Sequence, residues 1–223
     1  MEQEINCKIC NDFHFVNPLK NGVVNYSRVI PCSCVKEKAQ RDKVKRLLDW
    51  CELPPASEEM TFDLFILTNG LRKAYEASVL VAKGNLKWLT LMSSVNRGKT
   101  HLAVAICRKW LERGIPARYA YVPLLMDELR RGYNQGGDGS YDVRFEMFLN
   151  TPLLVLDDLG TENSTPWVQE KLDTIIDYRL MHDLSLVVTT NLSPDQLSPR
   201  IASRLKRAGE IVAIDALEYK RKK

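Results

Sequence analysis

The stretch LMSSVNRGKTHLA, residues 91–103, decides the fold of this chain. Its second half matches the phosphate-binding pattern G-x-x-x-x-G-K-[ST] at Gly98, Lys99 and Thr100, but Ser93 stands where the first glycine is usual. Such a loop joins a buried strand to a helix, so that its N–H groups and the helix dipole converge on phosphate oxygens. The runs KWLTLM before it and KTHLAVAICRKW after it supply that strand and helix. A Gly-Lys-Thr tripeptide also arises by chance, so the loop alone does not identify a nucleotide site.

Two positions of the loop where glycine is common carry other residues. A serine held in the left-handed region would cost about 1–2 kcal/mol, and nothing in the sequence offsets this cost at Ser93. Asn96 is different, because asparagine enters the left-handed region readily. We therefore predict that the loop forms with altered contacts at its rim. The expected nucleotide-binding residues are Ser94, Val95, Asn96, Arg97, Gly98, Lys99, Thr100 and His101.

Outward from the loop, short apolar runs rich in β-branched or aromatic residues alternate with helical stretches. The runs are KWLTLM, ARYAYV, LLVLDDLG, LSLVVTTN and EIVAID. A spacing of about 30 residues predicts βαβ crossovers, and hence an α/β fold around a buried, five-stranded, mainly parallel sheet. Within this part, the segment NQGGDGS, residues 134–140, is by composition the most flexible.

The run LLVLDDLG, residues 153–160, is an apolar strand that ends in two carboxylates. Parallel sheets bind ligands at this carboxyl edge. Asp157 is expected to hold Mg²⁺ through water, with the same ion touching the Thr100 hydroxyl and the nucleotide phosphates. Asp158 is expected to polarise the attacking water. The alternative is that the paired acids only cap the strand and begin a turn.

Two further polar positions follow the apolar runs. Asn191, after LSLVVTT, is expected to orient the lytic water, and Thr190 is the weaker candidate. In the basic helix SPRIASRLKRAG, we predict that Arg204, or second Arg200, reaches a neighbouring subunit's site and stabilises transition-state charge. A solvated basic face is the other interpretation of these arginines.

The motifs GKTHLA, LLVLDDLG, VVTTN and SRL, in this order, resemble the AAA+ ATPases of the DnaC/DnaI helicase-loader and IstB transposition-helper group. MTFDLF, residues 60–65, resembles the segment that opens the ATPase domain in that group, and GTENSTPWVQEKLDTIIDYRL resembles its stretch after the acidic strand. The resemblance covers most of the chain and implies ATP as the nucleotide. It also implies that Phe62 and Phe65 lie near the adenine.

The chain departs from many AAA+ proteins after EIVAID, where about ten residues remain. We therefore expect no full C-terminal helical lid, and weak nucleotide binding unless a neighbouring subunit closes the site. Arg221 could take the role of a lid arginine, although a solvated basic tail is the favoured interpretation.

The N-terminal part carries four of the six cysteines, in the patterns C-x₂-C and C-x-C. In a reducing cytoplasm, disulfides are not expected, and a tetrahedral zinc site suits a segment too small to bury a core of its own. The predicted ligands are Cys7, Cys10, Cys32 and Cys34. His14 is a substitute ligand, and free thiols are the alternative. Asn21-Gly22 marks a hairpin tip between the two pairs.

A basic helix is expected at residues 36–50, because this run contains neither glycine nor proline. Between Lys36 and Arg46, six of eleven residues are basic, which suits either a phosphate track or a solubilising face. CELPPASEEM then predicts a surface linker, with a boundary near Leu53. The predicted domains are a zinc module with its helix, residues 1–52, and an AAA+ ATPase domain, residues 53–223.

Bulk properties agree with a water-soluble protein, because the net charge is +4 and hydrophobic residues make up 45% of the chain. No apolar run spans a bilayer and no secretory signal is evident, so we expect a cytoplasmic protein without a membrane partner. The resemblance implies an ATP-dependent loader of the replicative ring helicase onto single-stranded DNA, self-associating through the ATPase domain. Its N-terminal module would dock on the helicase, and residues 134–140 would line the DNA groove.

Two alternatives stay open at this stage. One is a transposition helper that coats duplex DNA and recruits a transposase. The other is an adaptor that does not hydrolyse ATP, because Ser93 and Asn96 have weakened the loop.

Overall fold

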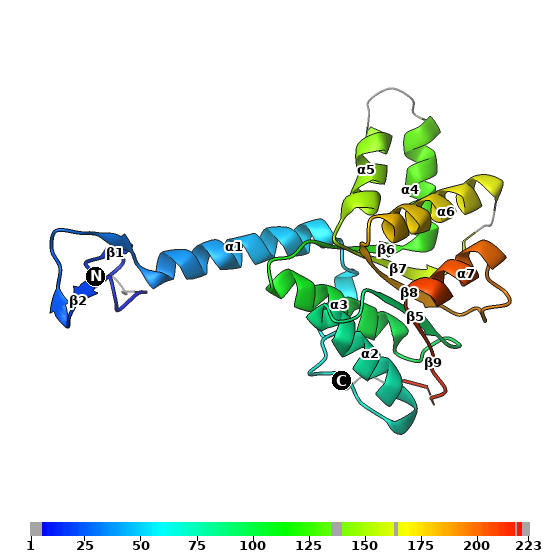
Figure 1. Cartoon of the computed structure of the whole chain (residues 1–223), viewed down its shortest axis with the longest axis horizontal. Helices are drawn as coiled ribbons and strands as arrows, with labels where there is room; N and C mark the ends of the chain where they lie inside the picture. The colour runs from blue at the N-terminus through cyan, green and yellow to red at the C-terminus, as the bar shows by residue number, and fades with distance from the viewer. Residues whose placement is uncertain (1–5, 135–139, 163–164, 217, 220–223) are drawn as a thin grey trace. The chain divides into compact units, whose positions relative to one another are not determined.

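In a computed structural model of the chain, the five apolar runs form the strands of one parallel sheet (Figure 1). The structure describes residues 6–134, 140–162, 165–216 and 218–219. The chain divides into two compact units, Met1–Arg46 and Leu47–Lys223. The sheet lies in the second unit in the order β6-β7-β8-β5-β9, and all its pairings are parallel. Its strands are β6 (Ala117–Tyr121), β7 (Leu153–Leu159), β8 (Ser185–Thr190), β5 (Trp88–Met92) and β9 (Glu210–Ala213).

The two faces of this sheet are covered by separate apolar layers, as expected for parallel strands with few polar residues. Alternate residues of one strand reach opposite layers: Val155 packs with one, and Leu154 and Leu156 with the other. Helices α2 (Arg72–Lys83) and α3 (Lys99–Glu112) cover the first face. The helices of the other face are α4 (Val122–Asn134), α5 (Ser140–Asn150), α6 (Pro166–Met181) and α7 (Pro199–Ala208). The predicted α/β architecture is confirmed (Figure 1).

The helix boundaries follow from capping residues in the sequence. The side chain of Thr165 accepts a hydrogen bond from the Val168 N–H at the start of α6, and Ser198 caps α7 in the same way. Proline follows both caps, at the position where it fits the first turn. Helix α2 ends at Gly84, whose φ of 82° is the left-handed conformation common at helix ends.

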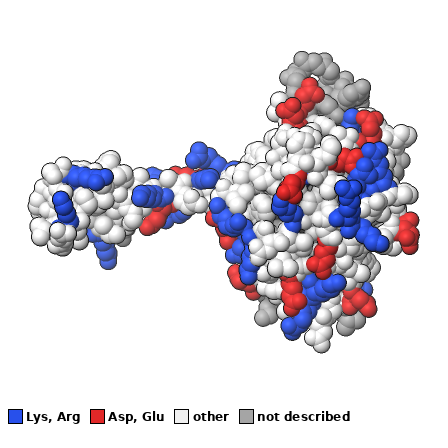
Figure 2. Space-filling view, in the orientation of Figure 1, with Lys and Arg blue, Asp and Glu red and all other residues white. Residues whose placement is uncertain are grey.

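The first unit contains two small antiparallel pairs and the start of a long helix. Strand β1 (Phe15–Val16) pairs with β4 (Ile30–Pro31), and β2 (Leu19–Lys20) pairs with β3 (Val23–Val24). Asn21 and Gly22 both have positive φ, at 54° and 81°, which confirms the predicted hairpin tip. Helix α1 (Ser33–Cys51) contains the predicted basic run. On the face drawn in Figure 2, acidic side chains are interspersed among its basic ones.

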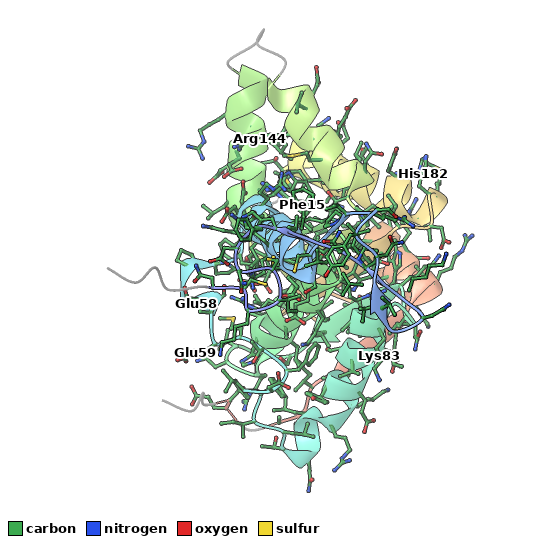
Figure 3. All side chains as sticks on the ribbon, turned by 90° about the vertical axis from the view of Figure 1, so that its left-hand side faces the viewer. Phe15, Glu58, Glu59, Lys83, Arg144 and His182 are labelled. Atoms are coloured by element: carbon green, nitrogen blue, oxygen red, sulfur yellow. The ribbon has the colours of Figure 1, made fainter. Side chains whose placement is uncertain are left out.

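The predicted surface linker, residues 51–60, packs on the second unit along part of its length. Glu58 and Glu59 are exposed and point outward (Figure 3), whereas Cys51, Ser57 and Met60 are buried. A single turn of 3₁₀ helix, η1 (Pro55–Ser57), lies within the segment, and a second, η2 (Asn69–Leu71), precedes α2. The compact units divide inside α1, between Arg46 and Leu47, so the domain boundary near Leu53 stays a prediction.

Two further observations concern the residues after β9 and the length and polarity of the helices. Among the described residues that follow β9, through Tyr219, there is no helix. Within the described ranges, every helix is too short or too polar to cross a membrane.

Candidate nucleotide-binding site

The loop between β5 and α3 adopts the conformation expected of an anion cradle. Asn96 has a φ of 57°, which confirms the prediction that asparagine takes a left-handed position there. Gly98 has a φ of 82° and precedes the first residue of α3. Ser93 does not have a positive φ, so the strain considered at this position is not present. The loop therefore forms without its first glycine.

The backbone of this loop offers hydrogen-bond donors that the described protein groups do not use. In the described part of the chain, the N–H groups of Gly98, Lys99 and Thr100 have no protein acceptor. They lie at the N-terminus of α3, where the helix dipole contributes about half a positive charge. Unpaired N–H groups at such an end are suited to phosphate oxygens.

Lys99 is anchored within the same loop. Its ammonium nitrogen donates to the Ser93 carbonyl at 2.9 Å, the Ser93 hydroxyl at 3.0 Å and the Ser94 carbonyl at 2.9 Å. A fourth bond, of 2.8 Å, reaches the Asn191 side-chain carbonyl on the neighbouring strand end. The cation is thus held where the loop curves, and an incoming phosphate would replace some of these neutral acceptors.

Burial and nearby charges shift the pKa of Lys99 in opposite directions. Its partial burial lowers the pKa of the ammonium group below the ordinary value, because the charged form is less well hydrated there. Asp158 and Asp157 oppose this shift through their negative charges. The site therefore holds a cation between a loop that accepts anions and a pair of acids.

Asp157 is buried within a ring of hydroxyl groups. Tyr119 donates to one carboxylate oxygen at 2.6 Å, and Thr189 donates to the other at 2.6 Å. The Thr100 hydroxyl lies 3.2 and 3.1 Å from the two oxygens. Burial, together with the Asp157 charge, raises the pKa of the Tyr119 phenol, so this group stays a donor at neutral pH. These hydroxyl groups fix the orientation of the Asp157 carboxylate.

A β-bulge explains how two consecutive acids reach one site. Successive side chains of a regular strand point to opposite faces, but β7 shifts register against β8 between Leu156 and Leu159. Asp158 has a φ of 63° at this point. The irregularity turns its side chain toward Asn191, whose amide donates to Asp158 at 2.6 Å. Both carboxylates therefore line the same pocket.

This pocket has a volume of about 380 Å³ and unites most of the predicted site residues. Its lining comprises Val95, Asn96, Arg97, Gly98, Lys99, Thr100, His101, Tyr121, Asp157, Asp158, Thr189, Asn191 and Tyr219. Ser94 does not line it, although the Ser94 carbonyl holds Lys99. Thr190 does not line it either, because its hydroxyl donates to the Leu159 carbonyl. Strand β8 thus presents Thr189 to the pocket, and Asn191 follows directly after the strand.

Arg204 is not among the residues that line this pocket. Its guanidinium forms an ion pair with Asp177 of α6, with a second bond of 2.9 Å to the same carboxylate. Arg200 contacts that carboxylate as well, at 2.7 Å. A role of Arg204 in a neighbouring subunit stays a prediction, and it would require this pair to break.

The two phenylalanines assigned to the base by resemblance lie in different surroundings. Phe65 is buried against the loop: a Cβ atom added at Gly98 would stand 3.2 Å from its ring. The ring also packs edge-on to His101, with 5.1 Å between centroids. Phe62 is buried too, but it packs on Tyr75 and borders a separate cavity near the ends of α2 and α3. Phe65 is therefore the one of the two that adjoins the phosphate loop.

Besides Tyr121, which lines the pocket, three contributors to the site were missed by sequence reasoning. Tyr119 and Thr189 lie inside apolar runs and were taken only as strand residues. Tyr219 belongs to the short C-terminal segment that is interpreted from the sequence as a solvated basic tail. The only sequence signal for the first two is a polar hydroxyl within an otherwise buried strand.

Thr189→Val is expected to lower the free energy of unfolding by about 2 kcal/mol. The Thr189 hydroxyl donates to Asp157 and accepts from the Asp158 N–H at 2.9 Å, so valine leaves this N–H unpaired and removes one of the donors to the buried Asp157 carboxylate. Urea unfolding at constant slope measures the change. Thr174→Val removes an exposed hydroxyl bonded to the Glu170 carbonyl and should stay within about 0.5 kcal/mol of wild type. Equal stability of the two variants would mean that Thr189 does not hold the bulge.

The four predicted cysteine ligands meet in the first unit. The sulfur atoms of Cys7, Cys10, Cys32 and Cys34 all lie within 4.8 Å of one another. Two pairs, Cys7–Cys32 and Cys10–Cys34, are separated by 3.8 and 3.5 Å. Sulfur atoms bound tetrahedrally at about 2.3 Å from zinc are about 3.8 Å apart. The donor set and its spacing therefore fit a structural zinc ion.

The pKa values of the thiols in this cluster shift in opposite directions, because burial raises those of Cys10 and Cys34. The backbone N–H groups of Cys10 and Ile9 lower the pKa of the Cys7 thiol to about 7. His14 is a neighbour of the cluster, with its Nδ1 at 3.9 Å from the Cys34 sulfur. The set of four thiols is complete without it.

Comparisons with known proteins find relatives that are named as helicase loaders, and solved structures that share the fold. The replicative helicase loader DnaI of Bacillus subtilis is 27% identical over 218 residues, covering 88% of this chain and 68% of DnaI. The crystal structure of the DnaC helicase loader has a TM-score of 0.64 and 27% identity, over 73% of this chain and 100% of that chain. AMPPCP-bound DnaA from Aquifex aeolicus shares the fold, with a TM-score of 0.65 and 23% identity. The match covers 73% of this chain and about half, 51%, of that DnaA chain.

The sequence model of the IstB-like ATP binding proteins matches residues 21–205. This range includes the phosphate loop, both acids of β7, Asn191 and Arg204. The resemblance inferred from the motifs is confirmed by this match and by the DnaI and DnaC relatives. The chain therefore belongs to the IstB-like ATP binding protein family.

Proposed function

We propose that the pocket at the carboxyl edge of the sheet binds MgATP and hydrolyses it. The observation that carries this proposal is the meeting of Lys99, Thr100, Asp157, Asp158 and Asn191 around one pocket. These residues come from three separate strand ends, β5, β7 and β8. Chance occurrence of one tripeptide would not bring them together, so the convergence supports a working nucleotide site.

The phosphates would lie on the loop N–H groups, with the Lys99 ammonium among their oxygens. Thr100 and Asp157 would hold Mg²⁺, and the ion would neutralise phosphate charge. Their oxygens lie 3.1 and 3.2 Å apart and are of the hard type that Mg²⁺ prefers. The hydroxyls of Tyr119 and Thr189 hold the Asp157 carboxylate in the orientation that this task requires.

Asp158 and Asn191 would act on the attacking water. Asn191 accepts from Lys99 and donates to Asp158, so it connects the phosphate side of the pocket to the carboxylate side. Asp158 would polarise the water, and Asn191 would orient it toward the terminal phosphate. Arg204 of a neighbouring subunit would add positive charge, so hydrolysis would be slow until the protein self-associates.

On this basis, the protein loads a replicative ring helicase onto single-stranded DNA in the cytoplasm, with ATP as the switch. The DnaI and DnaC relatives support this proposal, because both are helicase loaders by name. The first unit, with four cysteines for zinc and the basic start of α1, would dock on the helicase. Of the segment assigned to the DNA groove, residues 135–139 lie outside the described residues, as does Arg221.

A second candidate function follows from the family itself. IstB-like proteins give the matched family its name, and a transposition helper would use the same ATP site on duplex DNA. The two candidates differ in their partner protein and in the form of the DNA.

A loading assay separates them. The protein is incubated with MgATP, circular single-stranded DNA and the ring helicase of the same organism, and helicase retained on the DNA is measured. A loader is expected to increase the retained helicase at least about tenfold over helicase alone. Retention of a co-encoded transposase on duplex DNA, with no effect on the helicase, would instead identify the transposition helper.

A further inference from the structure

The residues after β9 turn back across the phosphate loop. The Ile214 N–H donates to the Met92 carbonyl at 2.8 Å, which continues the path of β9 beside β5. Gly70 leaves room for the passage, because a Cβ atom there would overlap the Asp215 carbonyl. Two hydrogen bonds then reach Asn96. The Tyr219 N–H donates to the Asn96 carbonyl at 2.7 Å, and the Asn96 side-chain amide donates to the Glu218 carboxylate at 3.2 Å. We call Glu218 and Tyr219 the tail contact.

The Tyr219 ring lies directly against the candidate nucleotide site. It stacks on Phe65 with 4.9 Å between centroids and 17° between planes. Its hydroxyl accepts a hydrogen bond from the Ile66 N–H at 3.2 Å and lies 3.3 Å from His101 Nδ1. A Cβ atom at Gly98 would stand 3.2 Å from this ring as well. The ring therefore covers the point where the loop enters α3.

These contacts are the ones that a nucleobase would need. A base beside bound phosphates requires an aromatic face to stack on and a backbone N–H group to pair with an acceptor on its edge. Phe65 supplies the aromatic face and Ile66 supplies the N–H group, and Tyr219 already contacts each of them. Tyr75 also stacks on Phe65, at 5.7 Å and 28°, so the stacking positions on this ring are already taken.

Resting on the proposed ATP site, we propose that Tyr219 occupies the base position and sets nucleotide affinity by competing with the base. ATP binding requires the ring to leave Phe65. The carboxylate of Glu218, held on Asn96 at the rim of the loop, adds repulsion toward the incoming phosphates. The measured affinity is the intrinsic affinity multiplied by the fraction of molecules in which the tail contact is open.

The test compares wild type, Tyr219→Ala and Tyr219→Phe by calorimetric titration of the full chain. Two probes are used with Mg²⁺: ATP, and inorganic tripolyphosphate, which has no base. Phenylalanine keeps the stacked ring and loses the hydroxyl that accepts from Ile66. Tyr178→Ala is the matched control, because that tyrosine also stacks on a ring, His182, and forms a hydrogen bond, to Asn150. Thermal unfolding checks that each variant is folded.

Tyr219→Ala is expected to bind MgATP about tenfold more tightly than wild type, with Tyr219→Phe in between. Tripolyphosphate affinity should change less than about twofold, and Tyr178→Ala should match wild type with both probes. Unchanged or weaker MgATP binding by Tyr219→Ala would overturn the inference, because the ring would then be absent from the base position or part of its wall. An equal gain with both probes would also overturn it, since the tail would then obstruct the loop alone.

These outcomes separate the inference from the function on which it rests. If MgATP binding depends on Lys99 but Tyr219→Ala does not bind MgATP more tightly, the proposed ATP site is supported and the competition by Tyr219 is contradicted. If neither wild type nor either variant binds MgATP, both the proposed ATP site and the competition by Tyr219 are contradicted.

Discussion

Lys99→Ala is expected to weaken MgATP binding by at least about 100-fold, which corresponds to about 2.7 kcal/mol. The substitution removes the cation that faces the bound phosphates, and hydrogen bonds from charged donors to phosphate are among the strongest in proteins. ATP hydrolysis and ATP-dependent helicase delivery should be lost with binding. Calorimetric titration, a phosphate-release assay and helicase retention on single-stranded DNA measure the three effects.

Lys83→Ala is the matched control, because Lys83 is an exposed lysine at the end of α2 (Figure 3). It should bind MgATP like wild type. Lys99 also holds two loop carbonyls, so the circular dichroism and thermal unfolding of Lys99→Ala must be measured alongside. A folded Lys99→Ala protein with wild-type affinity and delivery would show that the loop is vestigial, in favour of the adaptor that does not hydrolyse ATP.

Cys32→Ser is expected to lose at least about half of the bound zinc and to unfold the first unit. This unit leaves large apolar side chains such as Phe13 and Tyr26 exposed, at 79% and 82%, so it has little core to stabilise it without metal. If the four thiols bind zinc as predicted, this binding would be the main source of its folding free energy. Metal analysis of wild type should return one zinc ion per chain, as the single group of four cysteines predicts.

Two control variants test the ligand set. His14→Ala should keep the full zinc content, because His14 is a neighbour of the four thiols and not one of them. Cys107→Ala should keep it too, because Cys107 is buried in the core of the second unit. Full zinc in Cys32→Ser together with zinc loss in His14→Ala would replace the proposed ligands by three cysteines and a histidine.

Much of the fold was predictable because its signals are local. Each strand is a short apolar run between helical stretches, and the phosphate loop has a fixed spacing before Lys99. Asp157, Asp158 and Asn191 were identifiable because each ends or follows such a run. Parallel strands bring these ends to one edge whatever the strand order.

The remaining features of the site depend on contacts between distant segments. Tyr119 reaches Asp157 only because β6 lies beside β7, and an apolar run does not specify its neighbour. Thr189 and Thr190 are adjacent and chemically identical, so the register of β8 decides which of them faces the pocket. The hydroxyl of Tyr219 and the Ile66 N–H are 153 residues apart in sequence.

Because of the β-bulge, the position of the two carboxylates depends on the number of residues in β7 as well as on their type. Loss of either Asp157 or Asp158 would remove the extra residue of the bulge and leave a single carboxylate at this edge of the sheet. No substitution at the surviving position could restore the missing side chain. Over evolutionary time, a one-codon deletion there would therefore be harder to compensate than a change of either amino acid.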